Sequence, residues 1–298
     1  MMKLLKFIVV GLVCSSIVKA AELPSNDIAI FNYSVGGDKV TVDNRPFHLT
    51  YRTGYDNQPK FSNDGKIIYF TRGLNGKDGE GKDKFQTDIM EYDFAAKHLS
   101  NISHSTDSSE YSPTPYKDGV LTIIGVADAN GKQYLNQLSI DTGEQHTFTT
   151  AIEPVGYHAW LNDKEAPVFV LGDVMTLQVL HTDANRKPMV IAENIGRCIQ
   201  RLQQNLVSFT IEKEGVHYIY LINGVHEISD TGIVLAKDVQ DYVWLNDREV
   251  VFGQGSKLYR KSTETLEEIA DLAKQGIHGI SRLAIDKNNN RLAVVYNR

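Results

Sequence analysis

The chain has 298 residues, of which 42% are hydrophobic, and its formal net charge at pH 7 is −6. An acidic chain of this kind is a poor partner for nucleic acid or for an anionic membrane surface. It contains two cysteines, Cys14 and Cys198, and only Cys198 lies outside residues 1–20. An intrachain disulfide in the mature protein is therefore excluded, and with it the class of small disulfide-stabilised secreted modules.

Residues 1–20 have the pattern of a secretory signal peptide. Lys3 and Lys6 precede an apolar stretch, and small residues predict cleavage after Ala20. The apolar stretch is too short for a membrane-spanning helix, and no later stretch approaches the required length. We therefore expect a secreted, periplasmic product without a membrane span. Lipidation of Cys14 is the alternative, which the valine before it disfavours.

A short turn motif recurs along the predicted mature chain, residues 21–298. Each copy has a strand, an Asx-type turn and an apolar strand, and the turn aspartates are Asp64, Asp118, Asp163 and Asp247. They are separated by one or two units of roughly 40–55 residues, a period typical of propeller blades. A single blade cannot bury both faces of its sheet. The sequence therefore predicts an all-β fold, a closed β-propeller that forms one domain over the whole mature chain.

Counting the strands gives five complete blades and one incomplete blade. The complete blades are predicted at residues 58–102, 112–149, 157–192, 198–228 and 241–270. The chain then continues with only two strands, 279–285 and 291–296, whereas two strands without an inner partner, 27–33 and 39–43, precede the first blade. Because an open ring would expose sheet edges, we expect these N-terminal strands to complete a sixth blade and close the ring. Residues 266–274 are the one stretch that favours a helical turn.

The first two blades carry the fullest form of the repeat. Residues 57–70 read proline, one residue, an aromatic, a polar turn with Asp-Gly-Lys and an apolar strand, and residues 87–93 follow with the pattern D-I-x-x-Y-D. Residues 109–115 match the start of this pattern. The repeat resembles that of the TolB-like six-bladed propellers, which implies a periplasmic protein that binds a protein or another ligand. The additional N-terminal domain of TolB is not expected, because only residues 21–26 precede the first predicted strand.

The loops that lead into the innermost strands of a propeller open onto one mouth of its central channel. These segments bring carboxylates, aromatics, histidines and arginines to that mouth, where propellers bind ligands or peptides. The candidate ligand-binding residues are Glu110, Tyr111, Tyr157, His158, Arg197, Asp241, Tyr242, His278 and Arg282. The two arginines suit bidentate contacts to an anionic group. We therefore expect a monomeric, non-catalytic scaffold without a cofactor that binds an envelope protein or a small anionic ligand.

Signatures of catalysis are weak in this sequence. It contains no Gly-x-Ser-x-Gly elbow, and His226 lacks the second histidine of a zinc-protease motif. No catalytic residue or metal ligand is therefore assigned. One alternative is a lyase or hydrolase that acts on a polyuronide or another glycan, with Glu110, His158, Asp241 and His278 as a metal or acid–base set in the channel. A structural envelope component that binds no small ligand is a further alternative.

Three other features are interpreted structurally. Residues 73–84 are predicted to form a mobile polar loop in blade one rather than a calcium site, because the segment departs from the calcium-loop pattern. Trp160 and Trp244 occupy equivalent positions before their turns, and we expect them to pack blade against blade. Cys198 is expected to be a buried, unreactive thiol.

Overall fold

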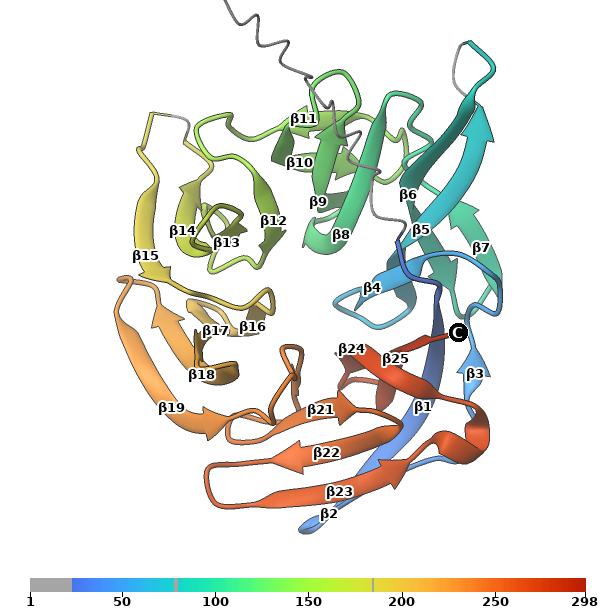
Figure 1. Cartoon of the computed structure of the whole chain (residues 1–298), viewed down its shortest axis with the longest axis vertical. Helices are drawn as coiled ribbons and strands as arrows, with labels where there is room; N and C mark the ends of the chain where they lie inside the picture. Colours follow the sequence, from blue (N-terminus) through green and yellow to red (C-terminus); the bar gives the residue numbers. More distant parts are fainter. Residues whose placement is uncertain (1–22, 78–79, 184) are drawn as a thin grey trace, which may run out of the picture.

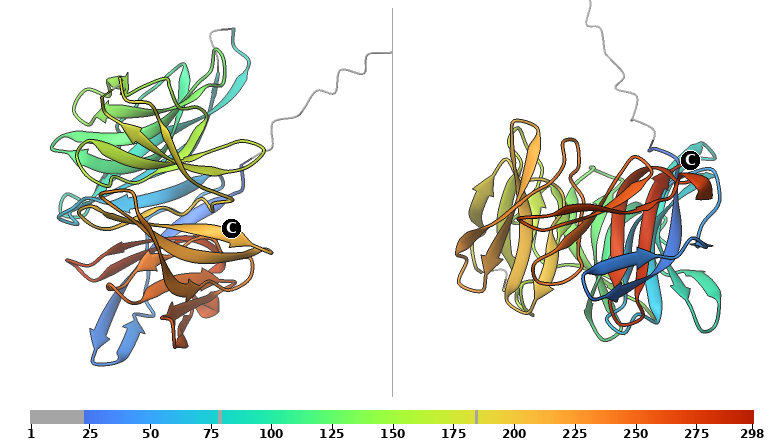
Figure 2. Two further views of the ribbon diagram at one scale, coloured as in Figure 1. Left: turned by 90° about the vertical axis from the view of Figure 1, so that its left-hand side faces the viewer. Right: turned by 90° about the horizontal axis from the view of Figure 1, so that it is seen from below.

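The computed structural model describes residues 23–77, 80–183 and 185–298 of the chain. The predicted signal peptide and Cys14 lie outside these residues. Six antiparallel sheets are arranged around a central channel, as Figure 1 shows face-on and Figure 2 shows from two further sides. The predicted six-bladed β-propeller is therefore confirmed.

The first five blades follow one another along the chain, each with its innermost strand first. Blade one contains β4 (Asp56–Phe61), β5 (Ile67–Lys77), β6 (Asp83–Asp93) and β7 (His98–Asn101). Blade two contains β8 (Ser108–Lys117), β9 (Val120–Ala127), β10 (Gln133–Ser139) and β11 (Gln145–Thr147). Blade three contains β12 (Val155–His158), β13 (Glu165–Val170), β14 (Thr176–His181) and β15 (Met189–Glu193).

Blade four contains β16 (Gln200–Gln203), β17 (Leu206–Lys213), β18 (Val216–Asn223) and β19 (Ile228–Val234). Blade five contains β20 (Val243–Trp244), β21 (Val250–Gln254), β22 (Lys257–Lys261) and β23 (Leu266–Asp271). The helical turn expected near the end of blade five is a single 3-10 turn, Ala273–Gln275, and the residues before it form β23.

Blade six is built from both ends of the chain, as the strand count predicts. From the channel outward its strands are β24 (His278–Asp286), β25 (Arg291–Asn297), β1 (Asn26–Gly36) and β2 (Lys39–Val42), and β3 (Phe47–His48) also pairs with β1. β1 and β25 pair without interruption from Asn26–Asn297 to Asn32–Arg291. An ion pair of 3.2 Å between Arg298 and Asp27 extends this closure beyond the ladder.

The polar insertion of blade one is not the loop that the sequence predicts. β5 and β6 pair continuously from Gly73–Thr87 to Lys77–Asp83, so most of the insertion is a two-stranded ribbon that extends the blade (Figure 1). At its base the Phe85 ring covers Gly73, where a Cβ would lie only 2.7 Å from the ring. A ribbon that is exposed on both faces needs no apolar alternation, and the sequence pattern therefore gives no sign of its strands.

Two tryptophans join neighbouring blades, as their equivalent positions predict. Trp160 stacks on Tyr116 at 4.0 Å between ring centroids, and its Nε1 donates to Thr122 Oγ1 of blade two at 2.9 Å. Trp244 Nε1 donates in the same way to Ser208 Oγ of blade four at 2.7 Å. Because buried indole N–H groups need a partner, the two hydrogen bonds fix each tryptophan to the neighbouring blade. The rings themselves fill the space between the blades.

Ring closure can be tested on β1 itself. Phe31 is fully buried against the last strands, whereas Val35 on the same strand is 53% exposed. Phe31→Ala should destabilise the protein by about 3–5 kcal/mol, because a large core side chain is removed, and Val35→Ala should change stability little. Denaturant unfolding measures both values. Equal, small losses for the two variants would show that the N-terminal strands are an appendage and not part of the ring.

Candidate functional site

The innermost strands, or the segments that lead into them, place one side chain per blade around one level of the channel. Each stands six residues before the turn of its blade or before the position equivalent to it. The ring residues are Gln58, Ser112, Tyr157, Arg197, Asp241 and Arg282, and all six line one narrow cavity of about 70 Å³. We call this set the mouth ring. It contains two arginines and one carboxylate.

Asp241 holds both arginines of the mouth ring. Its Oδ2 accepts hydrogen bonds from Arg197 Nε at 2.8 Å and Nη2 at 2.5 Å, and its Oδ1 lies 3.6 Å from Arg282 Nη1. Arg282 Nη2 also donates to the Tyr157 hydroxyl at 2.7 Å, with its guanidinium 4.9 Å from the centre of that ring. Although burial opposes the charged form, Asp241 and Tyr157 raise the pKa of Arg282. The cluster therefore keeps one positive charge in excess.

Gln58 and Ser112 occupy the other side of the mouth ring. Both have a left-handed backbone, with φ of 56° and 55°, and each lies at a bulge in its strand. Gln58 Oε1 accepts hydrogen bonds from Thr71 Oγ1 at 2.8 Å and from the Ser112 backbone N–H at 2.9 Å. Over residues 23–298, apart from positions 78, 79 and 184, the buried Ser112 Oγ and Ser281 Oγ find no hydrogen-bond partner. Orphaned hydroxyls of this kind are ready to bind a polar ligand.

His158 also lines this cavity but carries no charge. It is only 6% exposed, and its Nε2 lies 2.7 Å from Thr122 Oγ1. Burial and the nearby Lys60 ammonium lower the pKa of His158 to about 3, so its ring is neutral at physiological pH. Cys198 lies beside it, 3% exposed, and burial raises the pKa of this thiol to about 11, as expected for an unreactive cysteine.

Four of the nine candidate residues lie away from the mouth ring. Glu110 is fully buried and accepts hydrogen bonds from Ser105, Ser108 and Gln145. Tyr242 is fully buried and donates to Ser208 Oγ at 2.7 Å. Tyr111 packs against the hydrophobic core between blades two and three, and His278 is exposed at the start of β24. The structure thus gathers Tyr157, His158, Arg197, Asp241 and Arg282 around one cavity.

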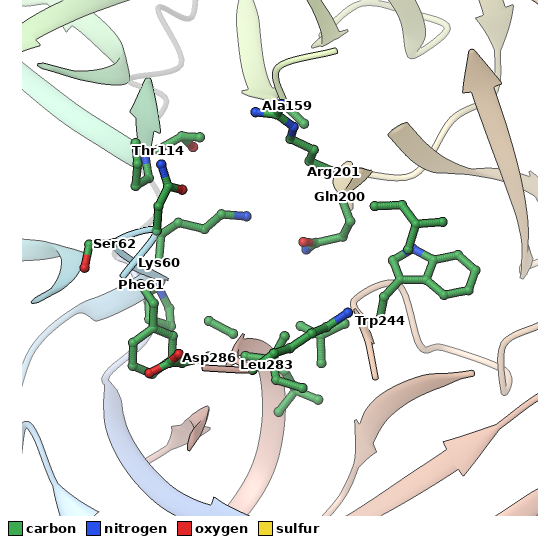
Figure 3. Close-up of a pocket in the computed structure, with 18 of the residues that line it drawn as sticks. Lys60, Phe61, Ser62, Thr114, Ala159, Gln200, Arg201, Trp244, Leu283 and Asp286 are labelled. Carbon is green, nitrogen blue, oxygen red and sulfur yellow. The ribbon is translucent and has the colours of Figure 1, made fainter. Parts of the chain in front are cut away.

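Lys60 is the channel residue that the sequence analysis misses. It lines the mouth-ring cavity and also a larger cavity of about 440 Å³ at the opposite end of the channel. Its side chain points into that space from one wall, and Gln200 points into it from the other (Figure 3). Lys60 stands four residues before its turn, where the other blades carry Thr114, Ala159, Ile199, Val243 and Ala284. Aligning the repeats at this position would have revealed the single charged side chain.

Two further findings concern the described residues as a whole. None of their helices has the length and apolar character needed to cross a membrane. No three histidine, cysteine or acidic side chains among them converge as a metal site.

No protein-family model and no curated protein matches this sequence. Among solved structures, a putative TolB from Agrobacterium tumefaciens is similar, with a TM-score of 0.63 at 11% identity over 93% of this chain and 99% of that chain. TolB from Acinetobacter baumannii is similar with a TM-score of 0.56 at 12% identity, over 92% of this chain and 65% of that chain. This chain therefore spans about two thirds of the length of the Acinetobacter protein.

The tricorn protease is also similar, with a TM-score of 0.53 at 15% identity, over 83% of this chain and 26% of that chain. At such low identities the likeness shows the fold alone. The fold is that of the TolB-like six-bladed propellers, as the repeat of the first two blades predicts.

The burial of Glu110 predicts an unusual pH dependence of stability. Burial raises the pKa of Glu110 although three neutral groups donate to it. A carboxyl whose pKa is higher in the folded state contributes stability below its unfolded pKa and loses it as pH rises through the folded pKa. Glu110→Gln should therefore gain stability relative to the unchanged protein as pH rises from 4 to 7. Thermal melts across that range measure the difference in stability between the two proteins. A Glu110→Gln variant that becomes less stable relative to the unchanged protein toward pH 7 would contradict this assignment.

Proposed function

We propose that this protein is a periplasmic, non-catalytic binding scaffold, and that its mouth ring holds an anionic group of an envelope protein or of a small ligand. One observation carries the proposal. Arg197 and Arg282 share the single carboxylate of Asp241, so the cluster keeps a positive charge for which the ring offers no second anion. The predicted signal peptide supports the periplasmic compartment.

The surroundings of the mouth ring suit an incoming ligand. The Arg197 side chain is 35% exposed, so part of its guanidinium is open to a ligand even while it contacts Asp241. A neighbouring cavity of about 400 Å³, lined by residues 238–241 and 279–283, adjoins both arginines. Its volume is within the range of small-ligand sites. A carboxylate that enters from this cavity would meet two planar, charged donors, the geometry that favours bidentate contacts.

Binding is favoured over the glycan-cleaving alternative by the state of the titratable groups. That alternative requires Glu110, His158, Asp241 and His278 to meet in the channel. Glu110 is enclosed by Ser105, Ser108 and Gln145, and His278 is exposed outside the lining of the channel cavities. His158 is neutral with a pKa of about 3, too low for a general base near neutral pH.

Opposite effects of two variants test the proposal. A library of acidic peptides with free C-terminal carboxylates, each paired with its amidated form, supplies the probe. Arg197→Gln should weaken binding of the best peptide by roughly ten- to a hundredfold, because a charge-assisted hydrogen bond is lost. Asp241→Asn should strengthen it, because the competing carboxylate is gone. Isothermal titration calorimetry measures both affinities.

Arg248→Gln is the matched control, since Arg248 is exposed in the turn of blade five and does not line the mouth ring. It should leave the affinity unchanged. Thermal melts confirm that each variant is folded. If no peptide binds the unchanged protein, or if Arg248→Gln and Arg197→Gln weaken binding equally, the mouth ring is not the site.

A further inference from the structure

The opposite end of the channel holds a second, larger cavity. It has a volume of about 440 Å³ and is lined by the turns of blades one, four and six, including Asn63, Gln203 and Asn288. At its inner end it meets the narrow mouth-ring cavity of about 70 Å³, and Lys60 lines both. The larger cavity is thus a cup that opens on the turn side and narrows toward the mouth ring. We call it the turn-side cup.

Three basic side chains from three different blades line the turn-side cup. They are Lys60 of blade one, Arg201 of blade four and Lys287 of blade six. No acidic side chain among the described residues lies within ion-pair distance of any of them. Asp286 also lines the cup, but its carboxylate is paired with Arg291. The Arg291 Nε and Nη2 atoms donate to Asp286 Oδ2 at 3.0 Å and 2.6 Å. Burial lowers the pKa of Lys287, and nearby Asp247 opposes that shift without forming an ion pair with it. The cup therefore carries three cations that form no ion pair among the described residues.

The positive charge of the turn-side cup contrasts with the net negative charge of the whole chain. The whole chain has a net charge of −6. Buried arginines elsewhere are neutralised, for example Arg72 by Asp56 at 2.8 Å and Arg260 by Glu249 at 2.5 Å. In the turn-side cup, by contrast, the half-buried Lys60 and the exposed Arg201 and Lys287 form no ion pair among the described residues. A cavity lined by one sign of charge concentrates ions of the opposite sign.

Lys60 gives the strongest reason to expect a ligand there. Its long side chain lies half-buried in the channel, and burial lowers the pKa of its ammonium group. An uncompensated charge that is partly removed from water costs stability, and such groups are found paired or in functional sites. The other blades place neutral side chains at this position, so the fold does not require a lysine.

We propose that the turn-side cup binds a small polyvalent anion, a phosphorylated or polycarboxylated solute, through Lys60, Arg201 and Lys287. The cup has the volume of a small-ligand site. Three cations on separate walls match a ligand with several negative groups better than a single carboxylate. Gln200, which points into the cup, supplies a neutral polar contact (Figure 3). This site is separate from the mouth ring and does not depend on its function.

Calorimetric titration with two probes tests the proposal. Pyrophosphate represents the phosphorylated class and citrate the polycarboxylated class, each titrated into the mature protein at physiological salt. At least one should bind saturably with one-to-one stoichiometry. Lys60→Met, Arg201→Gln and Lys287→Gln should each weaken that binding by roughly tenfold or more, because each removes one charged contact. If the unchanged protein binds neither probe, the proposal is wrong.

A matched control separates a built site from general charge attraction. Lys164 is exposed in the turn of blade three and does not line the cup, so Lys164→Gln should leave the affinity unchanged. Arg248→Gln, in the turn of blade five, should also leave it unchanged, because Arg248 lines neither the cup nor the mouth ring. Losses for Lys164→Gln equal to those for Lys60→Met would overturn the proposal. A loss for Arg197→Gln alone would assign the anion to the mouth ring instead.

Lys60 has a second readout that a purely structural residue would not give. Because the pKa of its ammonium is lowered, Lys60 loses its proton at a lower pH than an exposed lysine. Probe affinity should therefore fall as pH rises above neutrality, and Lys60→Met should remove this component. The ligand-free Lys60→Met variant should melt at the same or a higher temperature than the unchanged protein. A lower melting temperature together with an unaltered pH profile would show that Lys60 is a structural residue.

Discussion

Closure of the ring by β1 and β25 is the constraint on which the channel depends. The two strands pair over seven consecutive residue positions, and the Arg298–Asp27 ion pair joins Arg298 to the start of β1. β24 lies on the inner side of this ladder and carries Arg282 at its middle, and Lys287 follows its last residue. Both channel sites thus include a residue of the blade that only closure completes. A loosened N-terminal strand would widen the channel as well as expose a sheet edge.

The two ends of the channel differ in how their charged side chains are paired. At the mouth ring, Arg197 donates to Asp241 and to the Ser281 carbonyl, and Arg282 donates to Tyr157 and lies near Asp241. These contacts join blades three to six. In the turn-side cup Lys60 is half-buried, Arg201 and Lys287 are exposed, and none of the three forms an ion pair among the described residues. A charge that is partly removed from water without a partner costs stability. The mouth ring therefore has a structural role beside its proposed binding role, whereas Lys60 in the cup fits the proposed anion site.

The repeat predicts the fold well because its determinants are local. The Asx-type turn and the apolar strand after it recur in blades one, two, three and five, and the two-strand deficit at the C-terminus leaves one way to close the ring. Four mouth-ring residues follow from the same alignment, since Tyr157, Arg197, Asp241 and Arg282 stand equally far from their turns. The candidate residues that lie away from the mouth ring do so for physical reasons that the sequence does not display. Tyr242 follows Asp241 directly and faces the opposite side of its strand.

Two other differences between expectation and structure lie beside bulges. Glu110 pairs with Gly125 just before the shift at Tyr111–Thr114, and its carboxylate accepts from Ser105, Ser108 and Gln145. The shift between His278 and Arg282 separates that histidine from the mouth ring. Such bulges depend on tertiary pairing and leave no fixed signature in the sequence. Lys60 was hidden for another reason, because it occupies the variable position between proline and aromatic in the repeat.

Anomalous diffraction from bromide-soaked crystals tests most directly whether the channel is an anion-binding site. The account predicts a bromide peak in the turn-side cup near Lys60, Arg201 and Lys287, and a second peak beside Arg197 where that guanidinium is exposed. Crystals of Lys60→Met should lose the first peak and keep the second. Bromide bound only at outer surfaces of the blades, with an empty channel in the unchanged protein, would contradict the account.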